Sequence, residues 1–252
     1  MSERVEMLDR IRKALRRDTP AGATSNDFGP RLPKLEAVLT PIAPEDRVAR
    51  FETELGKVSG SAHRASTALE LDGVLWTIIE KSQATGVVLT RNRLLADIRL
   101  AEKLRGRVKT VAMWPESLAG ASGTDSEKVF RDQCFLAGIG ISGVDFVLAE
   151  TGSLVLSSET EGSQLASLSP PIHVALYRRQ QILGSLDEIL ERLPVSTGPG
   201  AATAGRSTVF ITGPSRTADI EQILIRGVHG PREVHAILVE ESCVAEMGAP
   251  QK

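Results

Sequence analysis

The chain has 252 residues, of which 41% are hydrophobic and 25% charged, and its formal net charge is -2. This is the composition of an ordinary globular protein, and α/β folds often reach this length as one domain. The balanced charge excludes the basic character that nucleic-acid binding uses. No apolar run reaches the length of about 18 residues that a membrane span needs, and none of signal-peptide type follows Met1, so we expect a cytoplasmic protein without a membrane span.

The cysteines and histidines give no metal-ligand pattern. Cys134 and Cys243 stand far apart, neither belongs to a C-x-x-C pair, and the chain has four histidines in all. An iron–sulfur cluster or a structural zinc ion needs about four closely spaced ligands. We therefore expect no metal site in this chain, and two buried thiols rather than a disulfide.

The N-terminal residues predict an arm that precedes the main domain. Residues 1–17 carry apolar side chains at helical spacing among arginines, which predicts a basic amphipathic helix. Residues 18–33 are rich in Pro and Gly, as in a flexible linker, and residues 34–252 form the α/β domain. The pattern favours neither packing of the helix on its own domain nor docking on a partner.

Helical and extended patterns alternate through the main domain. Helices are expected near residues 44–58, 71–79, 94–104, 127–138, 186–193 and 217–226. Strands are expected at residues 86–90, 108–114, 144–149, 154–156, 172–177, 207–211 and 234–239. The alternation predicts an α/β fold with a mainly parallel sheet flanked by helices. Only residues 150–153 separate two of the strands, which is too short for a parallel crossover, so the sheet should be mixed.

The connection between these two strands is the first candidate for chemistry. Gly152 suits a turn position with positive φ. Glu150 follows an apolar strand, where a low dielectric can raise the pKa of a carboxyl group and make it a base or a nucleophile. Glu150 could instead accept hydrogen bonds from the N–H groups of the turn, and the residues alone favour that interpretation.

The segment after residue 211 is the second candidate. Thr212, Gly213, Ser215, Arg216 and Thr217 follow a buried strand and precede the expected helix. Free N–H groups, hydroxyls and a guanidinium at the carboxyl end of a strand can bind an anion. An ordinary capped βα turn has the same pattern. The segment is not a Walker A loop, because the second Gly and the Lys are missing.

Two histidines are candidates for proton transfer. His229 lies in a loop next to Gly230-Pro231, and His173 follows Pro170-Pro171 at the start of a strand. A single loop histidine is more often solvated or bonded to the backbone. His63 and His235 stand in no pattern that suggests a function, and no Ser–His–Asp or Cys–His pairing follows from the spacing.

Four segments together resemble the lactate-utilisation (LUD) domain family. They are GVDFVLAETGSLVL (143–156), PIHV (171–174), ITGPSRTADIE (211–221) and GVHGP (227–231). The resemblance covers most of the chain and implies a fold similar to sugar-phosphate isomerases and CoA transferases. It also implies a part in the oxidation of L-lactate to pyruvate beside iron–sulfur partner proteins. This chain would carry no redox cofactor of its own.

The resemblance and the motifs lead to one site hypothesis. Glu150, Thr151 and Gly152 would line one wall of a cleft, Arg216 with its neighbouring residues would bind an anion, and His173 and His229 would handle protons. All three loops should then meet at one mouth of a single mixed sheet. Residues 158–169 depart from the family, because acidic and amide side chains stand where relatives often carry a basic residue.

Three functions stay open at this point. The first is a subunit of a lactate-oxidising complex that binds a small anionic substrate or supports its partners. The second is a stand-alone CoA-transferase-like or isomerase-like enzyme with Glu150 as nucleophile. The third is an assembly or regulatory module without catalysis, docked through its N-terminal helix.

Overall fold

The computed structural model describes Met7 and residues 41–114, 123–193, 207–218, 224–227 and 229–248, without the side chains of residues 123–125, 217–218 and 224–226. The chain divides into two units, residues 1–40 and 41–252, and the description below concerns the second. The predicted N-terminal helix and linker lie outside the described residues, apart from Met7. The domain boundary at residue 34 stays a prediction.

Six parallel strands form the main sheet, in the order β1-β12-β7-β4-β2-β3. They are β1 (Ser61–Ala65), β2 (Gly86–Leu89), β3 (Thr110–Met113), β4 (Ile139–Ser142), β7 (Ile172–Tyr177) and β12 (Glu233–Val239). Every residue of β2, β4 and β7 is buried, as expected for parallel strands that are covered on both faces. The predicted α/β fold with a mainly parallel sheet and flanking helices is confirmed.

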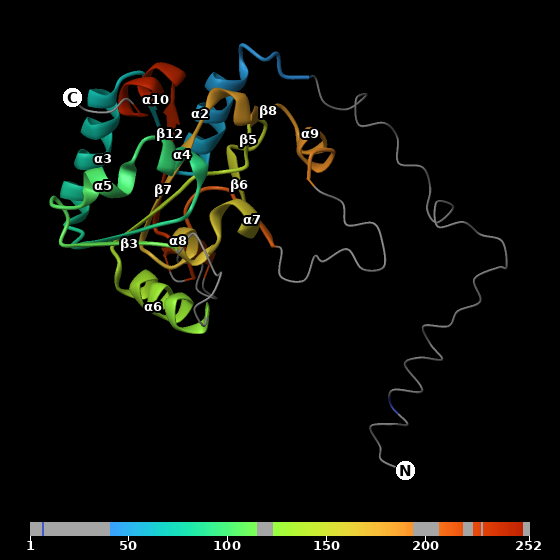
Figure 1. The fold of residues 1–252 in the computed structure, drawn as a ribbon. Helices are drawn as coiled ribbons and strands as arrows, with labels where there is room; N and C mark the ends of the chain where they lie inside the picture. Colours follow the sequence, from blue (N-terminus) through green and yellow to red (C-terminus); the bar gives the residue numbers. More distant parts are fainter. Residues whose placement is uncertain are drawn as a thin grey trace. The chain divides into compact units, whose positions relative to one another are not determined.

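Four helices cover one face of the main sheet: α3 (Ala68–Ser82), α4 (Arg93–Asp97), α5 (Leu100–Leu104) and α10 (Glu241–Gly248) (Figure 1). Helix α3 begins where the Thr67 hydroxyl accepts a hydrogen bond from Glu70 N. Its buried stripe of Leu71, Leu75, Ile78 and Ile79 packs on the sheet. The helix predicted over residues 94–104 is split into α4 and α5, because Arg99 adopts a left-handed φ of 52°.

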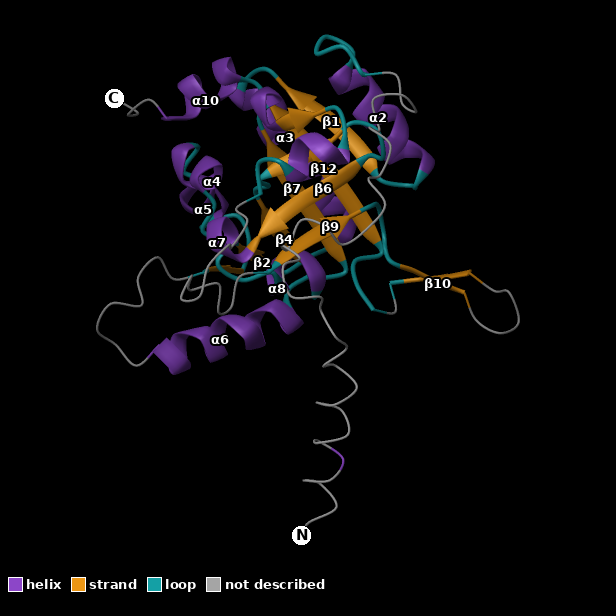
Figure 2. Ribbon diagram, turned by 90° about the vertical axis from the view of Figure 1, so that its right-hand side faces the viewer, coloured by secondary structure: helices purple, strands orange, loops and turns teal. Residues whose placement is uncertain are grey.

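A second sheet, in the order β8-β5-β6-β9, covers part of the opposite face together with α2 (Figure 2). These elements are β5 (Phe146–Leu148), β6 (Ser153–Ser157), β8 (Ile182–Leu183), β9 (Thr208–Ile211) and α2 (Arg47–Lys57). β5 and β6 pair antiparallel, as their short connection predicts. They belong to this second sheet and not to the main one, so the expectation of one single mixed sheet is wrong.

The remaining elements lie around these two sheets. They are α6 (Gly123–Leu136), α7 (Ser158–Glu161), α8 (Leu165–Leu168), the 3-10 helix η2 (Arg179–Gln181), α9 (Leu186–Leu190), β10 (Arg216–Ala218) and β11 (Leu224–Arg226). β10 and β11 form an antiparallel pair, so the helix predicted over residues 217–226 is wrong. Thr217 and Ile225 pair with each other, and both are β-branched, which favours a strand over a helix.

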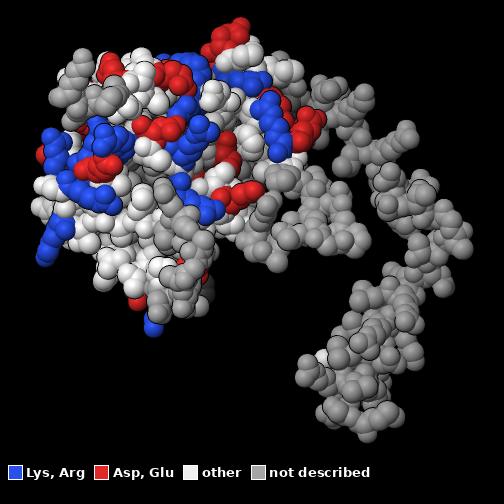
Figure 3. All heavy atoms as spheres, in the orientation of Figure 1, with Lys and Arg blue, Asp and Glu red and all other residues white. Residues whose placement is uncertain are grey.

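The surface gives two further observations. Figure 3 shows basic and acidic side chains interspersed on the face that it displays, so the described residues form no broad patch of one sign there. In the described part of the chain, the helices are all too short or too polar to cross a bilayer.

Candidate functional site

The turn between β5 and β6 faces two different neighbours. The Glu150 carboxylate accepts a hydrogen bond from Leu186 N at 2.8 Å, where α9 begins. This position suits a negative charge, because the N-terminus of a helix is positive. On the other side, the hydroxyls of Thr151 and Thr212 each lie 2.7 Å from the hydroxyl of Ser153, so the turn contacts the second predicted segment.

Both predicted glycine loops pack closely against the C-terminal end of α2. Gly152 has a φ of 68°, and a Cβ there would lie 2.3 Å from Leu55 N. Gly213 has a φ of 78°, and a Cβ there would lie 2.7 Å from Val58 O. Arg216 Nη2 donates to Val58 O at 2.7 Å, so the guanidinium caps α2, and its binding of an anion stays a prediction. We call this arrangement of Gly152, Gly213 and Arg216 around α2 the helix clasp.

The predicted histidines do not meet at the helix clasp. Ser215 N donates to Pro231 O at 2.8 Å, so the second and third predicted segments are neighbours. His229 itself is exposed. His173 is fully buried, with Nε2 2.8 Å from Ser142 Oγ. Burial, followed by the charge of His235, lowers the pKa of His173 to about 3, so this ring stays neutral and away from solvent. For Thr217 only the backbone is described.

The carboxyl ends of β2 and β4 surround a buried carboxylate. The chain leaves β2 for β3 on one side and returns to β4 on the other, and open α/β sheets bind ligands at such a switch point. Here Glu161, with no exposed surface, fills that position. It accepts hydrogen bonds from Thr90 Oγ1, Asn92 Nδ2 and Gly143 N. We call these four residues the Glu161 cluster.

A structural role explains the Glu161 cluster better than a catalytic role does. Burial raises the pKa of Glu161, whereas the bonds from Thr90 and Asn92 lower it. The bonds tie α7 to the ends of two central strands. Because each donor is satisfied and the side chain is sealed, no substrate can reach this carboxylate in the described conformation.

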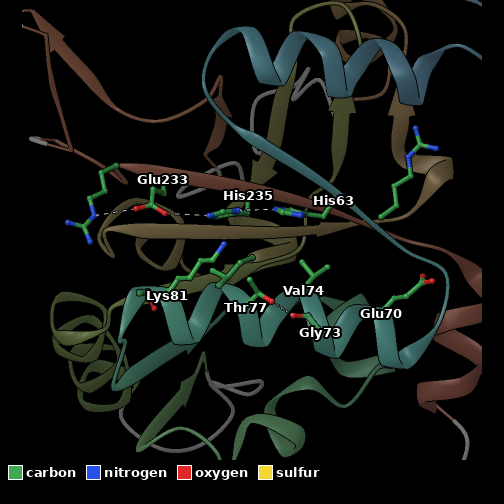
Figure 4. A pocket seen from close by; sticks show the side chains of 12 residues that line it. His63, Glu70, Gly73, Val74, Thr77, Lys81, Glu233 and His235 are labelled. Atoms are coloured by element: carbon green, nitrogen blue, oxygen red, sulfur yellow. Dashed lines mark hydrogen bonds and ion pairs between the residues drawn. The ribbon is translucent and has the colours of Figure 1, made fainter.

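A cavity of about 510 Å³ lies between α3 and the strands β1 and β12. In Figure 4, His63 and His235 lie end to end on the sheet side, above the residues of α3. His63 comes from β1, which is an edge strand, and His235 from β12 next to it. Cavities of this size that contain titratable groups with shifted pKa values are the usual candidates for binding sites. We call it the histidine pocket.

The two imidazoles form one hydrogen-bonded unit. His63 Nε2 lies 3.1 Å from His235 Nδ1, with ring centroids 5.4 Å apart and an interplanar angle of 25°. His235 Nε2 lies 3.7 Å from the Glu233 carboxylate, beyond hydrogen-bond distance. Burial is the largest cause that lowers the pKa of both rings. At neutral pH the unit is therefore uncharged.

The Glu233 carboxylate favours one arrangement of protons on this unit. It favours a proton on His235 Nε2, because that N–H points towards the negative charge. His235 Nδ1 then accepts from His63 Nε2–H, since a neutral ring has one donor and one acceptor. The Nδ1 atom of His63 is left as an unprotonated acceptor.

Most charges that line the histidine pocket are already paired. Arg64 donates to Glu52 at 2.6 and 2.7 Å, and Glu70 accepts from Ser66 N at 2.7 Å. Arg232 Nε lies 3.8 Å from Glu233. Lys81 has no ion pair with a carboxylate of the described residues. Among the described lining residues, the charges without an ion pair are therefore the Glu70 carboxylate at one end of the pocket and the Lys81 ammonium at the other, so the Lys81 end is the positive one.

Sequence analysis missed both the histidine pocket and the Glu161 cluster. His63 and His235 are 172 residues apart, and only the pairing of β1 with β12 brings them together. Glu161 stands in the segment that departs from the family pattern, which was the only available signal. Among the described residues, no group of three or more His, Cys, Asp and Glu side chains could hold a metal ion.

Comparison with known proteins identifies the family. A family model of the LUD domain matches residues 48–239. A "Lactate utilization protein C" from Exiguobacterium sp. is 27% identical over 241 residues, which are 96% of this chain and 97% of the relative. A protein of the same name from Oceanobacillus iheyensis is 28% identical over 173 residues, 68% of this chain and 70% of the relative.

A solved structure supports the same fold. The crystal structure of a DUF162 family protein from Deinococcus radiodurans matches with a TM-score of 0.53 and 19% identity, over 79% of this chain and 99% of that chain. At this identity the match concerns the fold alone. The likeness to sugar-phosphate isomerases and CoA transferases stays a prediction. The match of the family model to most of the chain shows that this protein belongs to the LUD domain family.

Proposed function

We propose that this protein takes part in lactate utilisation, as a cytoplasmic subunit of a system that oxidises L-lactate to pyruvate with iron–sulfur partner proteins. The observation that carries the proposal is the alignment over 96% of the chain with a relative named for lactate utilisation. Shared length matters here, because a match to one domain would leave the whole protein's role open.

The cysteines support the division of labour within this proposal. Oxidation of lactate to pyruvate releases two electrons and two protons, and the electrons need an acceptor. Cys134 and Cys243 are both buried and free. Burial raises the pKa of Cys134 to about 12 and that of Cys243 to about 11, so neither is a ready thiolate ligand. This supports the part of the proposal in which clusters held by the partner proteins, and not by these two cysteines, accept the electrons.

The geometry does not favour the alternative of a CoA-transferase-like enzyme. A nucleophilic carboxylate must reach a substrate carbonyl. The Glu150 carboxylate instead accepts from Leu186 N at the start of α9. Trapping an acyl adduct on Glu150 after incubation with acyl-CoA would reinstate this alternative.

Deletion of the gene tests the proposed function. The deletion strain should fail to grow on L-lactate as sole carbon source and should grow normally on pyruvate. The wild-type gene should restore growth on lactate, and a tagged chain should retrieve iron–sulfur proteins from lactate-grown cells. Normal growth of the deletion strain on lactate, without a second copy of the gene, would contradict the proposal.

A further inference from the structure

The wall that α3 contributes makes the histidine pocket long. One stripe of this helix lines the pocket, at the spacing of successive turns: Glu70, Gly73, Val74, Thr77, Ile78, Lys81 and Ser82. At about 1.5 Å per residue, this stripe is roughly 18 Å long. Figure 4 shows Glu70, Gly73, Val74, Thr77 and Lys81 in this order beneath the two histidines. The shape suits an elongated ligand.

The volume of the pocket argues against a three-carbon acid as its full occupant. Even at the ~30 Å³ that one water molecule takes up in the liquid, the six non-hydrogen atoms of lactate would fill roughly 180 Å³. The pocket offers about 510 Å³. A ligand that fills it therefore has more than twice the bulk of lactate.

Charge gives the pocket a direction. Arg64, which is paired with Glu52, and the Glu70 carboxylate lie towards one end. Lys81, without an ion pair among the described residues, and the loosely paired Arg232 lie towards the other. Between them, Val74, Ile78 and the neutral imidazoles offer no net charge. An anionic group is therefore favoured at the Lys81 end, and an uncharged body along the rest.

Gly73 supplies room for that body. It lies in the interior of α3, where glycine destabilises a helix by about 1 kcal/mol relative to alanine. A Cβ at Gly73 would meet no atom within 4 Å. Packing within the chain therefore does not require glycine here, and the missing side chain leaves open space in the pocket wall.

We propose that the histidine pocket binds an elongated organic anion that is larger than lactate. Its carboxylate or phosphate lies between Lys81 and Arg232, and its uncharged body extends past His235 and His63 to Gly73. A hydroxyl or N–H group of the body donates to His63 Nδ1. This inference does not depend on the proposed function, because a lactate-utilisation subunit could lack such a ligand and a protein with another role could bind it.

Binding of matched probes to the purified full-length chain tests the ligand class. The probes are riboflavin 5'-phosphate with riboflavin, 4-phenylbutyrate with 4-phenylbutyramide, L-lactate, and inorganic phosphate. Calorimetry should show that at least one of the two extended anions binds about tenfold more tightly than its neutral counterpart and than either small anion. The inference fails if neutral probes bind equally well, if L-lactate binds most tightly, or if no probe binds.

Matched variants test the place of binding. Lys81→Met should weaken binding of the anionic probe about tenfold, whereas Lys128→Met on α6 should not. Gly73→Leu should abolish binding by filling the pocket. Gly56→Leu is its control, because Gly56 also lies in a helix with nothing within 4 Å of a Cβ but does not line the pocket. Thermal unfolding must show all four variants folded, and unchanged binding by folded Gly73→Leu protein would overturn the proposal.

Discussion

The Glu161 cluster and the histidine pocket are two places where burial shifts the pKa of ionisable side chains. In the cluster, one carboxylate with no exposed surface accepts hydrogen bonds from Thr90, Asn92 and Gly143, and a longer one of 3.4 Å from Thr160. In the pocket, two imidazoles line a cavity of about 510 Å³, and no described residue donates to His63 Nδ1. One region is saturated and closed, and the other is open and retains bonding capacity.

This difference shows that a shifted pKa can have either a structural or a functional origin. A buried ionisable group can stabilise the fold or form part of a binding site, and the pKa shift alone does not distinguish these two roles. Unused donors and acceptors beside an accessible volume do. By this criterion the pocket is the functional candidate, although the cluster occupies the position where α/β sheets usually bind ligands.

The largest effect on stability is expected from breaking the Glu161 cluster. Glu161→Leu leaves the donors of Thr90, Asn92 and Gly143 buried without an acceptor, and each such loss costs about 1–3 kcal/mol. Urea unfolding should therefore show a free energy of unfolding lower by more than about 3 kcal/mol. Glu161→Gln retains one acceptor oxygen and should lose less. If the two variants are equally stable, the hydrogen bonds are not what the cluster contributes.

A second prediction concerns pH and sharpens the contrast between sealed and open histidines. Because the pKa of His173 is about 3 in the folded protein and near 6.5 when unfolded, acid protonates the unfolded chain first. This ring's contribution to stability is complete above pH 6.5 and decreases towards pH 3, by up to about 1.4 kcal/mol per pH unit.

Unfolding in urea at pH 7 and pH 5 measures this dependence. His173→Asn cannot titrate in this range and should lose less stability between the two values than the wild type does. An equal loss in both proteins would mean that His173 is protonated without penalty, and thus that its site is not sealed.

Removing the guanidinium from the helix clasp is expected to have a smaller effect. Arg216→Ala loses the bond from Nη2 to Val58 O at an exposed position, which should lower the free energy of unfolding by about 1 kcal/mol. Binding of the extended anionic probe should not change. A large loss of binding with unchanged stability would show that Arg216 holds the anion, as the sequence hypothesis stated.

The smallest expected effect is a gain in stability. Gly73→Ala adds a methyl group where no atom lies within 4 Å of a Cβ, so α3 should gain about 0.5–1 kcal/mol of helical preference. Thermal unfolding measures this gain. A lower melting temperature would mean that the wall of the pocket is already filled, and it would remove the basis for the pocket as a binding site.

Periodicity in the sequence was enough to predict the helices and strands that have clear apolar patterns. The stripe of Val48, Phe51 and Leu55 in α2 and the continuous run of β7 appear in the structure as expected. β1 was missed because its sequence, SAHRA, has only one fully buried residue. The assignment of β5 and β6 to a second sheet could not be predicted, because a short turn fixes antiparallel pairing but not the sheet to which the pair belongs.

The candidate site was harder to predict because it depends on strand order. His63 and His235 approach each other through the pairing of β1 with β12, and no local spacing records that pairing. Arg216 illustrates the opposite difficulty. A capped turn and an anion site use the same residues, and the hydrogen bond to Val58 O, which supports the capped turn, cannot be read from local spacing.

The helix clasp has a consequence for how relatives of this protein are interpreted. Two of the segments that carry the resemblance to the family, around Gly152 and from Gly213 to Arg216, hold loops against the end of α2. When two chains share such segments, we expect their loops to pack against α2 in the same way. Two relatives could share the helix clasp and differ in the residues of α3 and β12 that line the histidine pocket. They would then bind different molecules although they belong to one family.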